Sequence, residues 1–132
     1  MHLASSGDVI QALDLARAWL EKSPSNAVLK NAFAFFSIPL EPGHALRLLE
    51  EAPVIALDPL INIVNKAAGL LACKAFERCE ELLRDLASQI DGSESGWFWS
   101  PRTLIGNDTI RAEHSTIQAW VADALSVVDS AL

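Results

Sequence analysis

The chain has 132 residues, of which 51% are hydrophobic and 20% charged, and its formal net charge is −7. This length allows one sizeable hydrophobic core, so we expect a single domain over residues 1–132. Lysine and arginine never cluster along the chain, which argues against nucleic acid or an anionic membrane as a partner. The sequence contains neither a bilayer-spanning apolar stretch nor a signal peptide, so we expect a cytoplasmic protein.

The predicted secondary structure is helical. Ala and Leu dominate the apolar residues, and this balance favours helix over sheet. Apolar residues recurring at three- and four-residue steps predict helices over residues 8–22, 27–37, 44–52, 59–72, 74–90 and 108–131. On the first helix the expected inner face consists of Val9, Ala12, Leu13, Ala16, Trp19 and Leu20. On the last it includes Ile110, His114, Ile117 and Trp120. We therefore expect an all-α fold.

Residues 91–107 interrupt this helical pattern. They include three Gly, one Pro and three Ser, which predicts a long connection. The connection carries Trp97-Phe98-Trp99, and burying each ring is worth about 1.5–3 kcal/mol. One interpretation is that these rings plug the open end of the helical stack, with the last helix as a cap. The other is that Trp97 or Trp99 projects as an anchor for a binding partner.

A short motif recurs along the helices. A small residue followed three positions later by Leu occurs at Ala12, Ala45 and Cys79, with spacings of 33 and 34 residues. Helix-stopping prolines follow a similar period, since Pro24 and Pro59 are 35 residues apart. The recurrence predicts that one repeat consists of two helices and one proline.

This pattern resembles the tetratricopeptide repeat, whose period is about 34 residues. Residues 7–24 look like the second helix of such a repeat with its preceding glycine turn, and Ala12 lies at the position of the small residue. Ala67-Ala68-Gly69-Leu70, followed by Phe76 and Cys79, is similar to the next pair of helices. The resemblance covers residues 3–90. It implies a right-handed α-α superhelix of helical hairpins, here closed by a long C-terminal capping helix over 108–131.

The resemblance also implies that the chain starts in the middle of a repeat. Residues 3–8 look like the end of a first helix entering its turn. Hairpin arrays bury apolar faces between neighbours and normally need a polar cap at each end. The chain is therefore expected to be an excerpt of a longer protein, to have its first helix covered in a homodimer or larger assembly, or to begin with a lone helix.

Enzyme motifs are missing from the sequence. It contains no phosphate loop, dinucleotide fingerprint, nucleophile elbow or His-Glu-x-x-His pair, so we expect no catalysis and no cofactor. Glu113 and His114 would point about 100° apart on a helix, which makes a poor acid–base pair. Cys73 and Cys79 lack the further ligands of a metal site, and we expect buried structural thiols.

An acidic run is expected along one side of the fifth helix, formed by Glu77, Glu80, Glu81 and Asp85. A solvated helix face explains this run, and the alternative is a docking surface for a basic peptide.

The resemblance further implies a binding groove lined by the first helix of each repeat. Its candidate residues are Asn31, Phe35, Asn62, Asn65 and Lys66. Asn and Lys side chains can hold the backbone or the carboxylate of an extended peptide. Ordinary solvent exposure is the alternative for these residues.

These observations predict a protein–protein interaction module: an adaptor, a scaffold segment or a chaperone-like binder of a partner protein or peptide. The alternative is a non-catalytic regulatory or interaction segment of a larger enzyme, and an autonomous enzyme is the third hypothesis.

Overall fold

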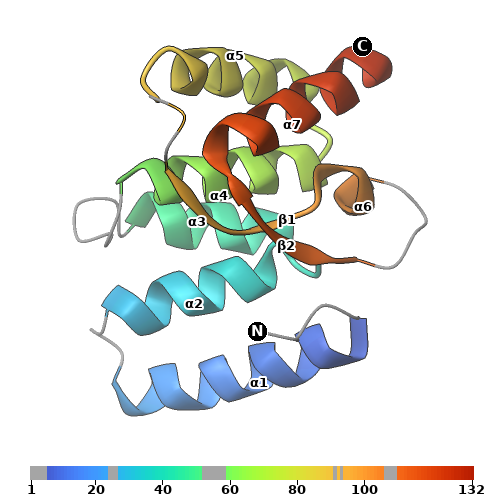
Figure 1. Ribbon diagram of the computed structural model, residues 1–132. Helices are drawn as coiled ribbons and strands as arrows, with labels where there is room; N and C mark the ends of the chain where they lie inside the picture. The colour runs from blue at the N-terminus through green and yellow to red at the C-terminus, as the bar shows by residue number, and fades with distance from the viewer. Residues whose placement is uncertain (1–5, 24–26, 52–58, 91, 93, 106–109) are drawn as a thin grey trace.

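The computed structural model describes residues 6–23, 27–51, 59–90, 92, 94–105 and 110–132. Within these residues the chain forms seven helices and a two-stranded antiparallel sheet (Figure 1). The helices are α1 (Ser6–Lys22), α2 (Ala27–Ser37), α3 (Pro42–Glu51), α4 (Pro59–Ala72), α5 (Phe76–Ala87), α6 (Pro101–Ile105) and α7 (Ile117–Ala131). The strands are β1 (Ser95–Trp99) and β2 (Ala112–Thr116).

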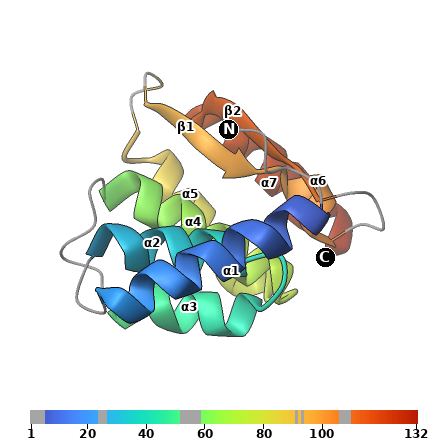
Figure 2. The ribbon, with the colours of Figure 1, turned by 90° about the horizontal axis from the view of Figure 1, so that it is seen from below.

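The first five helices form a stack in which each helix packs against the next one in sequence. Figure 1 shows α1 at one end of the stack and α5 at the other, with α3 and α5 running opposite to α4. The C-terminal segment then turns back, so that α7 contacts α5 and α4, while β1 and α6 also contact α4. Figure 2 shows this C-terminal layer and α3 on opposite sides of the stack. Helix α4 is therefore the central element.

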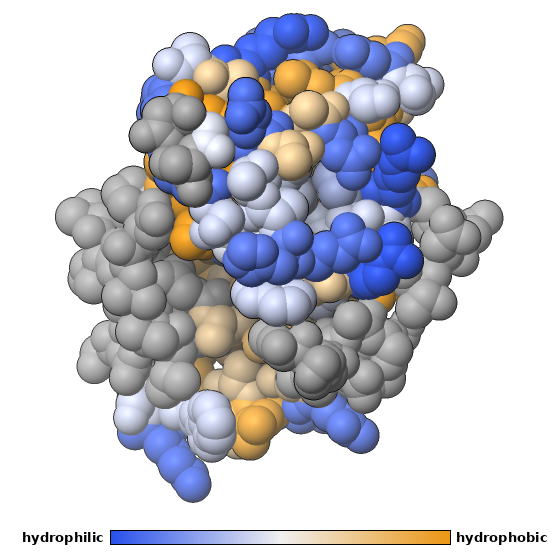
Figure 3. Space-filling model, in the orientation of Figure 1, coloured by the Kyte–Doolittle hydropathy of each residue, from blue (hydrophilic) through white to orange (hydrophobic). Residues whose placement is uncertain are grey.

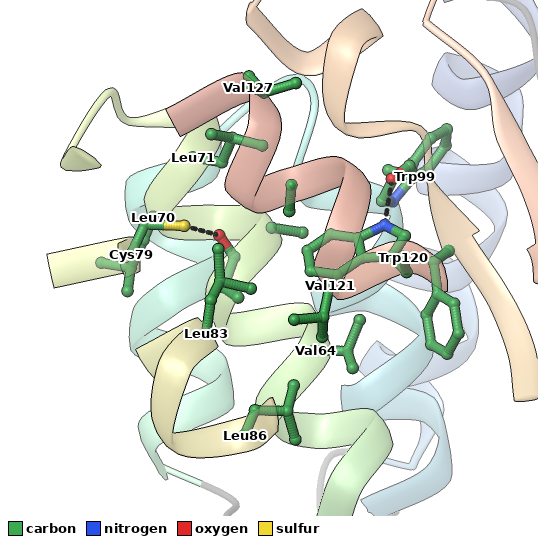
Figure 4. Close-up of a cluster of buried hydrophobic side chains, with 14 of the residues drawn as sticks. Val64, Leu70, Leu71, Cys79, Leu83, Leu86, Trp99, Trp120, Val121 and Val127 are labelled. Atoms are coloured by element: carbon green, nitrogen blue, oxygen red, sulfur yellow. Dashed lines mark hydrogen bonds between the residues drawn. The ribbon is translucent and has the colours of Figure 1, made fainter. Parts of the chain in front are cut away.

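The main core lies where α4, α5 and α7 meet (Figure 4). Leu83 and Leu86 of α5, Val64 of α4 and Val121 of α7 are almost fully buried in it. A smaller cluster joins α1 to α2 through Leu13, Ala16 and Phe33. Burial of these apolar surfaces is the main contribution to the stability of the stack.

The helices predicted before residue 90 are present, with ends that differ by a few residues. Pro42 and Pro59 each occupy the first position of a helix, where a missing N–H costs nothing and the fixed φ angle suits the helix. The predicted C-terminal helix is present as well, but it begins at Ile117 rather than near residue 108.

The expectation of an all-α fold is wrong for two segments. The predicted connection over 91–107 contains β1 and α6, and the first part of the predicted last helix is strand β2. The two strands pair so that Trp97 lies opposite His114 and Trp99 opposite Ala112. Thr116 starts α7, because its side chain accepts a hydrogen bond from the Ala119 backbone N–H at 3.1 Å.

A pairing between distant segments explains this difference. The apolar spacing of Ile110, His114 and Ile117 fits a helix locally, but the aromatic residues of β1 favour an extended strand that needs a partner. On the strand, Glu113 and His114 point to opposite faces, so the helical geometry expected for this pair does not apply.

The aromatic segment is divided between core and surface. Phe98 and Trp99 are 1% and 0% exposed, whereas Trp97 is 46% exposed. The Trp99 ring stacks on Phe35 of α2 with ring centres 4.9 Å apart, and its Nε1–H donates a 2.8 Å hydrogen bond to the Phe35 carbonyl oxygen. The ring of Trp99 thus lies against α2 rather than at the end of the stack beyond α5.

Three further side-chain predictions are wrong. His114 was expected on the inner face of the last helix, but it is exposed on β2. Trp19 was expected on the inner face of the first helix, but it is 51% exposed, because α1 lies at the end of the stack and packs mainly against α2. Cys73 was expected to be buried, but it is exposed just after the end of α4. Cys79 is buried as expected, and its thiol donates a hydrogen bond to the Ala67 carbonyl oxygen at 3.4 Å.

No helix in the described part of the chain is both long and apolar enough to span a membrane. The same residues contain no group of three or more His, Cys, Asp or Glu side chains that could hold a metal ion.

The first prediction compares the buried Trp99 with the exposed Trp97. Trp99→Ala should lower the free energy of unfolding by about 3–5 kcal/mol, because it leaves a cavity and an unpaired carbonyl group. Trp97→Ala should cost less than about 1 kcal/mol, since half of its side chain already lies in solvent. Urea unfolding followed by circular dichroism measures both values, and equal losses for the two variants would contradict the observed burial.

The second prediction concerns Cys79. Burial raises the pKa of its thiol from 9.0 to about 12, so the folded chain keeps a proton that the unfolded chain loses as the pH rises above 9. The free energy of unfolding should therefore decline between pH 9 and pH 12, and Cys79→Ala should show a shallower decline. Cys73→Ala is the control, with unfolding measured under reducing conditions. Identical slopes in all three proteins would refute the assignment.

Candidate functional site

A groove of about 340 Å³ lies between α3, α4 and α5. Its lining combines three leucines with five charged side chains. The residues are Leu46 and Glu50 of α3, Lys66 and Leu70 of α4, and Arg78, Glu81, Leu82 and Asp85 of α5. We call this feature the α3–α5 groove.

Helical periodicity places these residues together. The four residues of α5 follow the spacing i, i+3, i+4 and i+7, which puts them on one side of a helix. The residues from α3 and α4 are pairs spaced by four. Gly69 allows the two helices to approach, because a Cβ atom at this position would lie 2.8 Å from Cδ2 of Leu46. Leu46 therefore forms part of the apolar floor.

The charges at the rim of the groove lack partners. Among the described residues, no ion pair involves Glu50, Lys66, Arg78, Glu81 or Asp85. The carboxylate of Asp85 accepts a hydrogen bond from the Gln89 side-chain amide at 3.1 Å. Elsewhere on α5, Arg84 pairs with Glu80 at 3.4 Å, outside the groove. The rim thus offers charged groups that are free to meet a ligand.

The three candidate binding residues of α4 lie in different environments. Lys66 is half-buried and lines the α3–α5 groove. Asn62 and Asn65 are only 7% and 8% exposed, so in this conformation they offer little surface to a peptide. The Oδ1 atom of Asn62 is buried and has no hydrogen-bond partner.

The predicted residues of α2 and β1 do not join this groove. Phe35 and Trp99 stack on each other, and the Trp99 side chain is inaccessible. Trp97 is exposed and its ring makes an edge contact with His114 at 5.6 Å. Asn31 belongs to α2, but its side chain lies outside the described residues.

Three large apolar side chains of α1 are also exposed. Ile10, Leu15 and Trp19 are each about half exposed there. Figure 3 shows hydrophobic surface at the lower end of the molecule, over α1. The expectation that another subunit covers the first helix stays a prediction.

The α3–α5 groove is not the groove expected from the sequence, because α3 and α5, which supply most of its lining, are second helices of the predicted hairpins. Lys66 was a candidate residue, and Glu81 and Asp85 belong to the acidic run, whereas Glu77 and Glu80 do not line the groove. The three leucines, Glu50 and Arg78 were missed. The spacing of Arg78 from Leu82 and Asp85 was a usable signal, but the contribution of α3 required knowledge of helix packing.

Comparisons with models of protein families, with curated proteins and with solved structures found no match to this chain. Its function is therefore inferred from the groove itself.

The third prediction tests whether the rim charges serve folding. Glu81→Gln should change the free energy of unfolding by less than about 0.5 kcal/mol, since its carboxylate is exposed and makes no ion pair. Leu83→Ala, two residues away in the core, should cost about 2–5 kcal/mol. Urea unfolding compares them. A loss above about 1 kcal/mol for Glu81→Gln would indicate a structural role for the rim.

Proposed function

We propose that this chain is a protein–protein interaction module that holds a segment of a partner protein in the α3–α5 groove. The observation that carries the proposal is the combination of an apolar floor with unpaired charges at its edge. Apolar anchors supply binding energy when they are buried, and surrounding charges select the partner and its register.

The floor and the rim have separate roles in this proposal. Leu46 of α3 and Leu82 of α5 are half-buried and would contact the apolar side chains of the bound segment, whereas Leu70 of α4 is only 5% exposed and offers little surface. Each buried CH₂ group contributes about 0.8 kcal/mol, so two or three anchors suffice for a transient complex. Lys66 and Glu81 would pair with charges of the partner, and such pairs mainly govern specificity and the rate of association.

The proposed architecture is a degenerate array of helical hairpins of the tetratricopeptide type. The succession of helices α1 to α5, each packed on the next, supports it. So does the burial of the recurring small residue at Ala12, Ala45 and Cys79, which are 5%, 0% and 0% exposed. A small buried residue at each position lets successive helices approach closely. In such an array the chain would act as an adaptor, a scaffold segment or a chaperone-like binder in the cytoplasm.

The fourth prediction is that reversing the charge of two acidic rim residues abolishes partner binding. Glu81→Lys combined with Asp85→Lys should leave the fold intact and prevent recovery of the partner, because two attractive contacts become repulsive. The matched control is Glu21→Lys combined with Asp129→Lys. It makes the same change in net charge at exposed residues outside the groove.

The measurement is affinity purification from the cells that naturally express the protein, with chemical cross-linking and mass spectrometry. We expect a protein that cross-links near α5, is recovered with wild type and control, and is lost with the groove variant. Equal recovery by both variants, or no cross-link to α3, α4 or α5, would contradict the proposal.

A further inference from the structure

We infer that the segment bound in the α3–α5 groove is an amphipathic helix of mixed charge, with an acidic residue facing Arg78 and a basic residue facing Asp85 and Glu50. This inference rests on the proposed function and specifies its partner. It differs from the simplest expectation for a protein of net charge −7, which would be a uniformly basic peptide.

Backbone contacts show how residues of α4 and α5 are aligned along the groove. The Ala75 N–H donates to the Leu70 carbonyl oxygen at 2.9 Å, and the Cys79 thiol donates to the Ala67 carbonyl oxygen at 3.4 Å. The two helices therefore run antiparallel from their common turn, as Figure 1 also shows. Leu70 and Arg78 lie at the turn end of the groove, and Lys66 lies further along it.

The residues of α3 can be placed along the groove in the same way. Leu46 packs against Gly69, near the turn end of α4, and α3 runs in the same direction as α5 (Figure 1). Glu50 is one helical turn beyond Leu46, and Asp85 is two turns beyond Arg78. Glu50 and Asp85 are consequently displaced toward the same end, away from Arg78.

The rim charges are thus ordered along the groove. Arg78 is positive at the turn end, Lys66 and Glu81 of opposite sign lie in the middle, and the acidic residues follow at the far end. Arg78 and Asp85 are separated by seven residues of one helix, or about 10 Å. A partner with one acidic and one basic residue at this separation satisfies both ends, whereas a uniformly basic partner meets repulsion from Arg78.

A helical partner matches this spacing. Positions i, i+3, i+4 and i+7 of a helix share one face, so an acidic residue, two leucines and a basic residue at these positions would face the groove together. The 340 Å³ volume accommodates a few apolar side chains rather than a long segment. About two helical turns of the partner would therefore make the contact.

The test uses three fluorescently labelled, helix-stabilised peptides that share two leucines at i+3 and i+4. The mixed peptide has Glu at i and Lys at i+7, the basic peptide has Lys at both, and the acidic peptide has Glu at both. Fluorescence anisotropy measures the Kd with the 132-residue chain, at low salt because salt screens these contacts. We expect the mixed peptide to bind about fivefold or more tightly than either of the others.

The same binding assay is then repeated with charge-reversed variants of the protein. Arg78→Glu should weaken the mixed peptide about fivefold and make the basic peptide the better ligand. Arg84→Glu is the matched control, because it makes the same change on the same helix at an exposed position outside the groove. It should leave the preference for the mixed peptide unchanged.

The outcomes distinguish a failure of the inferred charge pattern from a failure of the proposed function. If the basic peptide binds wild type best, or if Arg78→Glu does not alter the order of affinities, the inferred charge pattern is wrong while a peptide-binding groove stands. If no peptide binds and the fourth prediction also fails, the proposed function fails as well. Retained helical content of each variant, checked by circular dichroism, excludes unfolding as the cause.

Discussion

The contact between Trp99 and α2 is the interaction on which the arrangement of this molecule depends. The indole ring stacks on Phe35 and donates a hydrogen bond to its carbonyl oxygen, across 64 residues of sequence. The Trp99 carbonyl oxygen accepts a 2.8 Å hydrogen bond from Nε1 of Trp120. One residue of β1 therefore connects α2 with α7. Buried polar groups that satisfy each other specify a single arrangement more strongly than apolar contact alone, so this contact determines where the C-terminal segment lies.

This arrangement leaves the two sides of the helical stack with different properties. The C-terminal layer covers one side of α4, where Val64 and Leu71 are fully buried together with α7 (Figure 4). Lys66 and Leu70 of the same helix line the α3–α5 groove. A helix that is held by a core on one side presents its other residues in a defined geometry, which is what a preorganised binding surface requires.

Helical segments with strong local signals were predictable. Apolar residues recurring at three- and four-residue steps indicated helices near their observed positions. Lys66 was predicted as a peptide contact because the resemblance places it on the first helix of a repeat, and a Lys side chain can hold a peptide carboxylate. The hairpin was not predicted, because residues 112–116 have no strong strand preference of their own and become a strand only by pairing with β1. Leu46 was missed as a groove residue for a related reason: its role depends on the close approach of α3 to α4 at Gly69.

The sequence by itself determined the local elements: a helical chain with few sheet signals, an acidic surface, and an aromatic triplet too apolar to be left entirely in water. These properties depend on intrinsic preferences and on spacing within a few residues. Only the tertiary structure decided that Trp99 is buried while Trp97 is exposed, that the triplet belongs to a strand, and that Lys66 shares a groove with Arg78 and Asp85. Each of these outcomes depends on contacts between segments far apart in the chain, whose energies no local pattern records.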